Sequence, residues 1–216
     1  MFHDMKIYLL IVPAAIGVIF AGLLALNTSE TSTNAFILNK ENLLQGATIL
    51  GDPNAGTTIV EFGDYQCTFC YKFHKETMNK IYEKYVIKGN VNFVFKDFPL
   101  NGEPSIRASE ASYCAQEQGK FWQYHNTLYK NWGGENTGWI TEDSLTMFAK
   151  NSGLELEEFD SCMKNSKFRQ KVLDNEQFAK ENNINATPSF LIFSGNEVYR
   201  IIGSQPFEKF EQVFQE

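Results

Sequence analysis

The sequence has no excess of basic residues. Its 216 residues include 19 Lys and Arg against 26 Asp and Glu, which gives a formal net charge of −7. Proteins that bind nucleic acids or anionic lipid headgroups concentrate positive charge on one face. The charge balance therefore argues against a nucleic-acid partner, and the sequence offers no basic patch for an anionic lipid surface.

Cysteine and histidine are also scarce, with four and three copies. Two cysteines form one C-x-x-C pair, Cys67 and Cys70, and no second such pair or H-x-x-x-H spacing follows. A closed structural zinc site needs four ligands, so zinc is not indicated and no metal is expected. One alternative stays open: His74 extends the pair to C-x2-C-x3-H, which suits a module that binds and delivers copper.

One long apolar run stands at the N-terminus. Residues 7–26 (IYLLIVPAAIGVIFAGLLAL) carry no charge and would span roughly 30 Å as a helix, the thickness of a bilayer core. We predict a membrane anchor at 1–26, followed by a polar tether at 27–46. A cleaved signal peptide, whose apolar region is normally about 7–15 residues, is the alternative. Either way the remaining chain lies outside the cytoplasm, on a single-pass anchor or as an exported protein.

The first half of residues 47–216 alternates strand and helix patterns. Residues 57–62 (TTIVEF) and 91–95 (VNFVF) predict buried strands, with a further short strand at 48–50. Between the two, apolar residues at helical spacing predict a helix over 68–88. A strand, helix and strand in this order imply parallel pairing through a right-handed crossover.

The second half begins with helices alone. Residues from about 100 to 183 lack strand patterns and predict several helices. Strands are predicted at 189–193 and 197–202, around a tight hairpin at 194–196, and a closing helix at 206–214. We therefore predict an α/β domain with a mixed sheet that is interrupted by a helical insert.

The C-x-x-C pair falls at the junction of a predicted strand and helix. Unpaired backbone N–H groups at a helix N-terminus stabilise an anion. A Cys67 thiolate there would have a pKa lowered from about 8.5 toward neutrality. Cys70 is close enough in sequence to form a disulfide with Cys67, so the arrangement suits thiol–disulfide exchange.

Five segments in this order resemble the DsbA-like thiol–disulfide oxidoreductases, which are exported or membrane-tethered proteins. The family has a thioredoxin fold, in which helices flank a central mixed β-sheet, with an inserted α-helical subdomain. The segments are 51–54 (GDPN), 59–70 (IVEFGDYQCTFC), 95–99 (FKDFP), 114–122 (CAQEQGKFW) and 186–189 (ATPS).

Glu61 is a carboxylate inside an otherwise apolar strand, where burial without a partner is costly. The resemblance implies that it lies beneath the two cysteines and accepts the proton of Cys70 when that thiol attacks a mixed disulfide. The alternative is a solvated position at a strand end.

The resemblance also assigns a substrate-binding role to Thr187 and Pro188. It implies a cis peptide bond between them in a loop that faces the cysteine pair, with the backbone of Thr187 pairing with an extended substrate.

If Cys67 and Cys70 form a disulfide with each other, Cys114 and Cys162 are the two cysteines left to pair. We expect a structural disulfide between them in the helical insert. The alternative is two separate buried thiols that pack as small apolar residues.

The resemblance implies an enzyme without a cofactor that introduces disulfides into unfolded or reduced exported proteins. A membrane redox partner, a quinone-linked protein in similar systems, would reoxidise the dithiol. The sequence has Thr68 where the family commonly has Pro, which leaves the direction of electron flow open. A reductase or isomerase of the same fold is therefore the alternative within the family.

Overall fold

A computed structural model describes residues 40–215 of the chain. The predicted anchor at 1–26 and most of the predicted tether lie outside this range. No helix within 40–215 is both long and apolar enough to cross a membrane.

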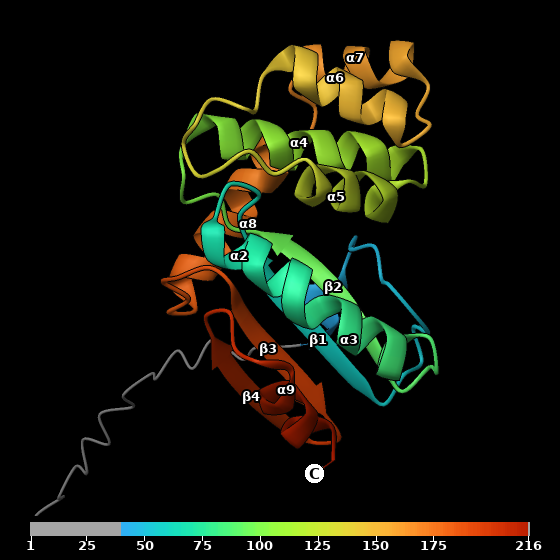
Figure 1. The fold of residues 1–216 in the computed structure, drawn as a ribbon, viewed down its shortest axis with the longest axis vertical. Coiled ribbons are helices and arrows are strands. Elements are labelled where there is room, and N and C mark those ends of the chain that lie inside the picture. The colour runs from blue at the N-terminus through green and yellow to red at the C-terminus, as the bar shows by residue number, and fades with distance from the viewer. Residues whose placement is uncertain (1–39, 216) are drawn as a thin grey trace, which may run out of the picture. The chain divides into compact units, whose positions relative to one another are not determined.

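The sheet has four strands in the order β2-β1-β3-β4 (Figure 1). The central strand β1 (Thr57–Gly63) pairs in parallel with β2 (Val91–Asp97) and antiparallel with β3 (Ser189–Ser194). The edge strand β4 (Glu197–Ile202) pairs antiparallel with β3. The predicted mixed sheet is therefore confirmed, with each of the first three strands one or two residues longer than the sequence indicated.

Alternate residues of β1 face opposite layers, as the two-residue period of a strand requires. Ile59 packs on one side with a continuous helical stretch and with α9 (Phe207–Phe214). Val60 and Phe62 pack on the other side with α1 (Lys40–Leu44) and with the end of α8 (Arg169–Glu181). By the same alternation, Glu61 shares the face of Ile59, against which the helical stretch lies.

That stretch runs from Thr68 to Val86 and carries the C-x-x-C pair at its start. It comprises α2 (Thr68–Phe73), η1 (His74–Met78), α3 (Asn79–Ile81) and η2 (Tyr82–Val86), the two η segments being π-helical turns. The stretch ends at Val86. Gly89, three residues later, has a φ of 76°, which favours glycine. Below we call Thr68–Val86 the redox helix.

Five helices form the insert between β2 and β3. They are α4 (Glu103–Glu117), α5 (Phe121–Lys130), α6 (Glu142–Asn151), α7 (Leu156–Lys164) and α8. Figure 1 shows α4–α7 stacked beyond the end of the sheet where α2 begins, with α8 returning to the sheet. The helical insert is therefore confirmed, and its inner face meets the start of the redox helix.

Two expectations at the beginning of the domain are corrected. Residues 40–44 form α1, whose Leu43 is buried against the sheet, so this part of the predicted tether belongs to the folded domain. Residues 48–50 do not form a strand, because only Leu50 makes an isolated bridge, to Phe93. Both segments are held by contacts with distant strands, which a local sequence pattern does not reveal.

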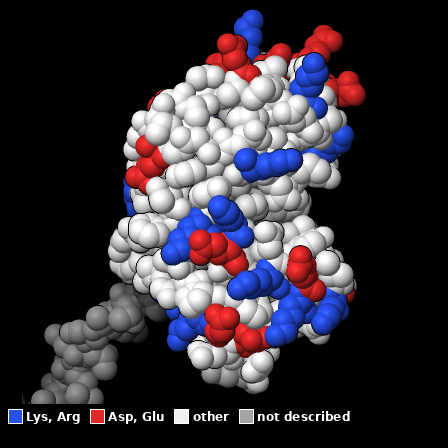
Figure 2. Space-filling view, viewed as in Figure 1, with Lys and Arg blue, Asp and Glu red and all other residues white. Residues whose placement is uncertain are grey.

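Charges of both signs are interspersed on the face drawn in Figure 2. This face therefore carries no large patch of a single charge sign.

Candidate active site

Cys67 occupies the N-cap of α2, in an extended conformation at the point where the chain leaves β1 and enters the redox helix. The Cys67 side chain makes no capping hydrogen bond of its own, and backbone N–H groups at a helix start stabilise an anion. Cys67 and Cys70 are both free thiols here, the former 6% exposed and the latter fully buried.

The surroundings of Cys67 lower its pKa to about 6. The largest contribution is the hydrogen bond from the Cys70 thiol, and the Thr187 side chain and the backbone N–H groups of Cys70 and Phe69 add to it. Burial of the sulfur opposes these bonds. At neutral pH most of Cys67 is therefore thiolate, the form that attacks disulfides.

Cys70 has the opposite character. Burial raises its pKa well above the usual value, and its hydrogen bond to Cys67 and the negative charges of Cys67 and Glu61 add to the effect. The backbone N–H of Asp64 lies 3.5 Å from the Cys70 sulfur and partly offsets the rise in pKa. The two thiols thus differ strongly in acidity, with a slightly exposed thiol of low pKa beside a fully buried thiol of high pKa.

Glu61 is 3% exposed, and its Oε1 has no hydrogen-bond partner. Desolvation, followed by the charge of Cys67, raises the pKa of this carboxyl well above its usual value. A carboxyl with a raised pKa can exchange a proton near neutrality. The solvated strand end, considered as the alternative, does not fit this burial.

The Thr187–Pro188 peptide bond is cis. The Cys67 thiol lies 3.4 Å from the carbonyl oxygen of Thr187, to which it donates. Pro188 is buried and Thr187 is half-buried, so the loop meets the Cys67 sulfur through its backbone. A peptide bound in an extended conformation along Thr187 would therefore pass directly beside the Cys67 sulfur.

Asp64 organises the turn before Cys67, although the sequence analysis did not single it out. Its buried carboxylate accepts hydrogen bonds from the Gln66 N–H at 2.8 Å, the Asn101 N–H at 2.8 Å and the Ser105 hydroxyl at 2.6 Å. Asn101 and Ser105 begin the helical insert. Asp64 therefore fixes the position of the cysteine pair relative to the insert.

The metal alternative gains no support from His74. Its ring stacks on Tyr129 with centroids 4.6 Å apart, and burial lowers its pKa to about 4. Across residues 40–215, no group of three or more His, Cys, Asp or Glu is placed to hold a metal ion.

Cys114 on α4 and Cys162 on α7 are joined by a disulfide. The bond links two helices of the insert within the same buried cluster that contains Cys67 and Cys70.

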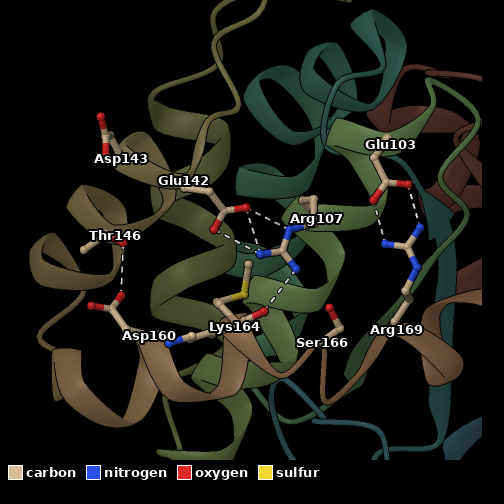
Figure 3. Close-up of a pocket in the computed structure, with 10 residues that line it drawn as sticks. Glu103, Arg107, Glu142, Asp143, Thr146, Asp160, Lys164, Ser166 and Arg169 are labelled. Atoms are coloured by element: carbon tan, nitrogen blue, oxygen red, sulfur yellow. Dashed lines mark hydrogen bonds and ion pairs between the residues drawn. The ribbon is translucent and has the colours of Figure 1, made fainter.

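A hollow of about 600 Å³ opens between α4, α6 and α7, away from the cysteine pair (Figure 3). Its two arginines are already paired: Arg107 binds Glu142 and the buried Glu110, and Arg169 binds Glu103. We therefore interpret the hollow as the surface of a structural ion network within the insert.

The comparisons with known proteins agree with this geometry. A family model described as "Thioredoxin" matches residues 44–215, and the probable disulfide bond formation protein D of Bacillus cereus is 30% identical over 152 residues, covering 68% of this chain and 69% of that protein. The chain belongs to the DsbA-like thioredoxin family. The disulfide bond formation protein D of Bacillus subtilis is a second relative of this DsbA-like chain, with 27% identity over 169 residues, 77% of this chain and 75% of that protein.

Solved structures support the DsbA-like fold. Oxidised BdbD from Bacillus subtilis has a TM-score of 0.73 at 26% identity, with 80% of this chain and 92% of that chain covered. The alpha-DsbA1 of Wolbachia pipientis has a TM-score of 0.68 at 24% identity, with 78% and 89% covered. The second likeness bears on the fold alone.

Proposed function

We propose that this protein introduces disulfides into exported proteins through the Cys67–Cys70 pair. The observation that carries the proposal is the difference between the two thiols, since Cys67 has a pKa of about 6 whereas that of the buried Cys70 is well above the usual value. Such a pair stabilises its own reduced state, and stabilising the dithiol makes the disulfide a stronger oxidant.

The first step uses the oxidised pair. A substrate thiolate attacks the Cys67 sulfur, the Cys67–Cys70 bond breaks, and Cys70 leaves with the bonding electrons. Glu61, whose raised pKa lets it carry a proton, supplies that proton to Cys70. The product is a mixed disulfide between the substrate and Cys67.

The second step releases the oxidised substrate. Another substrate thiolate attacks the substrate sulfur of the mixed disulfide, and Cys67 leaves as a thiolate. A thiol of low pKa is a good leaving group, so the lowered pKa of Cys67 accelerates this step. Two electrons pass from two substrate thiols to the protein, which ends as a Cys67 thiolate and a Cys70 thiol.

A further oxidant must regenerate the disulfide. We propose a membrane redox partner, quinone-linked as the family resemblance implies, whose disulfide is attacked by the Cys67 thiolate. Cys70 then attacks Cys67 in the mixed disulfide while Glu61 accepts its proton. The apolar run at 7–26 supports a membrane anchor that would hold the domain near such a partner.

We further propose that Thr187 and Pro188 form the surface that binds the substrate backbone. The Thr187 carbonyl lies beside the Cys67 sulfur, and its backbone would pair with an extended substrate in the manner of an added strand. The side chain of Phe69, which is 59% exposed within the C-x-x-C motif, offers an apolar contact to an unfolded chain.

The test is oxidation of a reduced, unfolded protein by the full-length chain. We expect wild type that starts with the Cys67–Cys70 disulfide to form disulfides stoichiometrically without an added oxidant, and Cys67→Ser to be inactive. Cys70→Ser, mixed with oxidised glutathione, should accumulate a mixed disulfide between Cys67 and glutathione, because the thiol that would resolve it is missing. A wild-type pair that stays oxidised in the presence of reduced substrate would contradict the proposal. A strongly reducing potential would instead favour the reductase or isomerase alternative.

A further inference from the structure

A segment of the insert folds over the start of the redox helix. It is the loop 131–139 between α5 and α6, which we call the cap loop. The indole N–H of Trp132 donates to the carbonyl oxygen of Gln66 at 3.2 Å, and the Trp132 ring stacks on Tyr71 with centroids 4.4 Å apart. The cap loop is thereby attached both to the turn before Cys67 and to the first turn after it.

Two glycines allow this loop to fold tightly on itself. A Cβ at Gly133 would lie 2.6 Å from Cβ of Trp139, and Gly134 has a φ of 109°. The Thr137 hydroxyl donates to the Gly133 carbonyl at 2.9 Å. Glu135 lies between these fixed points together with Asn136, so the loop sets where the backbone of Glu135 runs.

Glu135 binds the residue that directly follows Cys67. The backbone N–H and the hydroxyl of Thr68 both donate to Oε2 of Glu135, each at 3.2 Å. The next two backbone N–H groups, of Phe69 and Cys70, contribute instead to the lowered pKa of Cys67. The start of the redox helix therefore serves two acidic groups, the Glu135 side chain and a Cys67 thiolate that exists only in the reduced protein.

We propose that Glu135 is a positioning residue that sets the reduction potential of the Cys67–Cys70 pair, by holding a negative charge on Thr68 against the Cys67 thiolate. The proposal rests on the redox function proposed above. Two electrons and one proton convert the disulfide into the Cys67 thiolate and the Cys70 thiol. Only the product carries the new negative charge, so Glu135 disfavours the reduced state and moderates the oxidising power of the pair.

The effect of Glu135 on the reduction potential depends on Thr68, the residue that it binds. Thr68 supplies two donors to the carboxylate, whereas a proline at the first helical position would supply none. The Thr in the C-x-x-C motif thus connects the pair to a charge on the insert, 67 residues away.

The test is the equilibrium of the full-length chain, in mild detergent, with mixtures of reduced and oxidised glutathione. Glu135→Gln keeps the size and an acceptor oxygen but removes the charge. We expect the equilibrium to shift roughly three- to tenfold toward the dithiol, where tenfold corresponds to about 30 mV for a two-electron couple. Alkylation of Cys67 should also reach half its maximal rate at a lower pH.

Three comparisons distinguish charge from structure. Glu157→Gln changes net charge equally at an exposed position of α7 and should not shift the equilibrium. The effect of Glu135→Gln should shrink in 1 M salt, where the Debye length is about 3 Å. Thr68→Val, which loses the hydroxyl bond but keeps the N–H, should shift the equilibrium in the same direction by less.

An unchanged equilibrium in Glu135→Gln, or an equal shift in Glu157→Gln, would overturn the role of Glu135 while leaving the exchange reaction intact. Failure of the wild-type chain to equilibrate with glutathione at all would instead contradict the redox function itself.

Discussion

The backbone N–H of Asp64 points at the Cys70 sulfur, 3.5 Å away across the turn that joins β1 to the redox helix. The same residue uses its carboxylate to bind Gln66 and the beginning of the insert. Asp64 therefore holds the buried Cys70 thiol in place and connects it to the helical insert.

The first prediction concerns Glu61. Glu61→Gln removes the group that we propose to carry the Cys70 proton, so formation of the mixed disulfide with the substrate should slow by about 100-fold or more. Stopped-flow kinetics of reduced peptide oxidation would measure this. Thr58→Val changes another buried polar side chain of β1 and should leave the rates within about twofold. Equal slowing in both variants would show that a disturbed strand, not the lost carboxyl, is responsible.

The second prediction is the pH dependence of the reduction potential. Below the Cys67 pKa of about 6, reduction takes up two protons, and above it only one, because Cys67 stays ionised. The potential should therefore fall by about 59 mV per pH unit below pH 6 and by about 30 mV above it. Because the folded-state pKa of Cys67 is depressed, the stability that its thiolate gives the reduced protein is lost as pH falls through 6. A single slope from pH 4 to 8 would contradict a lowered Cys67 pKa.

The third prediction concerns the disulfide of the insert. Replacing both Cys114 and Cys162 by Ser opens a loop of 48 residues and should lower the free energy of unfolding by about 4 kcal/mol on the loop-entropy model. Denaturant titration of the oxidised protein would measure it. The glutathione equilibrium of Cys67 and Cys70 should remain that of wild type, because the bridge lies in the helices behind the pair. A loss of exchange in the folded variant would assign the bridge a redox role.

The fourth prediction concerns the ion network of Figure 3. Glu110 is 1% exposed and is bound by Arg107 at 2.7 Å. Arg107→Met leaves this buried carboxylate with only the Arg169 guanidinium, 4.0 Å away, and should cost about 3 kcal/mol of stability. Arg169→Met, whose main partner Glu103 is 58% exposed, should cost less than about 1 kcal/mol. Equal losses in thermal unfolding would show that burial of Glu110 does not set the difference.

Local patterns predicted most of the fold. The strand around Glu61, the redox helix and the strand pair at 189–202 each carry a periodicity that their own residues determine, and the order of these elements limits the topology. The helix α1 was missed, and the strand predicted at 48–50 was reduced to one bridge at Leu50, because both segments depend on contacts with distant strands. The π-helical turns of the redox helix also leave no mark in a pattern of apolar residues.

The site residues also fall into two groups, those that the sequence alone makes conspicuous and those that it does not. Cys67, Cys70 and Glu61 stand out because their types are unusual at their places in a strand or at a helix start. Asp64 and Glu135 do not, since Asp is ordinary in a turn and Glu is ordinary in an exposed loop. Their importance comes from partners 37 to 67 residues away, which only the folded chain brings together.

The bridge between Cys114 and Cys162 makes this protein a client of the chemistry proposed for it. A newly exported chain has four cysteines and gives up two electrons for the bridge and two more for the pair. An oxidised older copy is able to accept the first two. Maturation would then accelerate as finished molecules accumulate, and the first molecules in a cell without any would mature slowest.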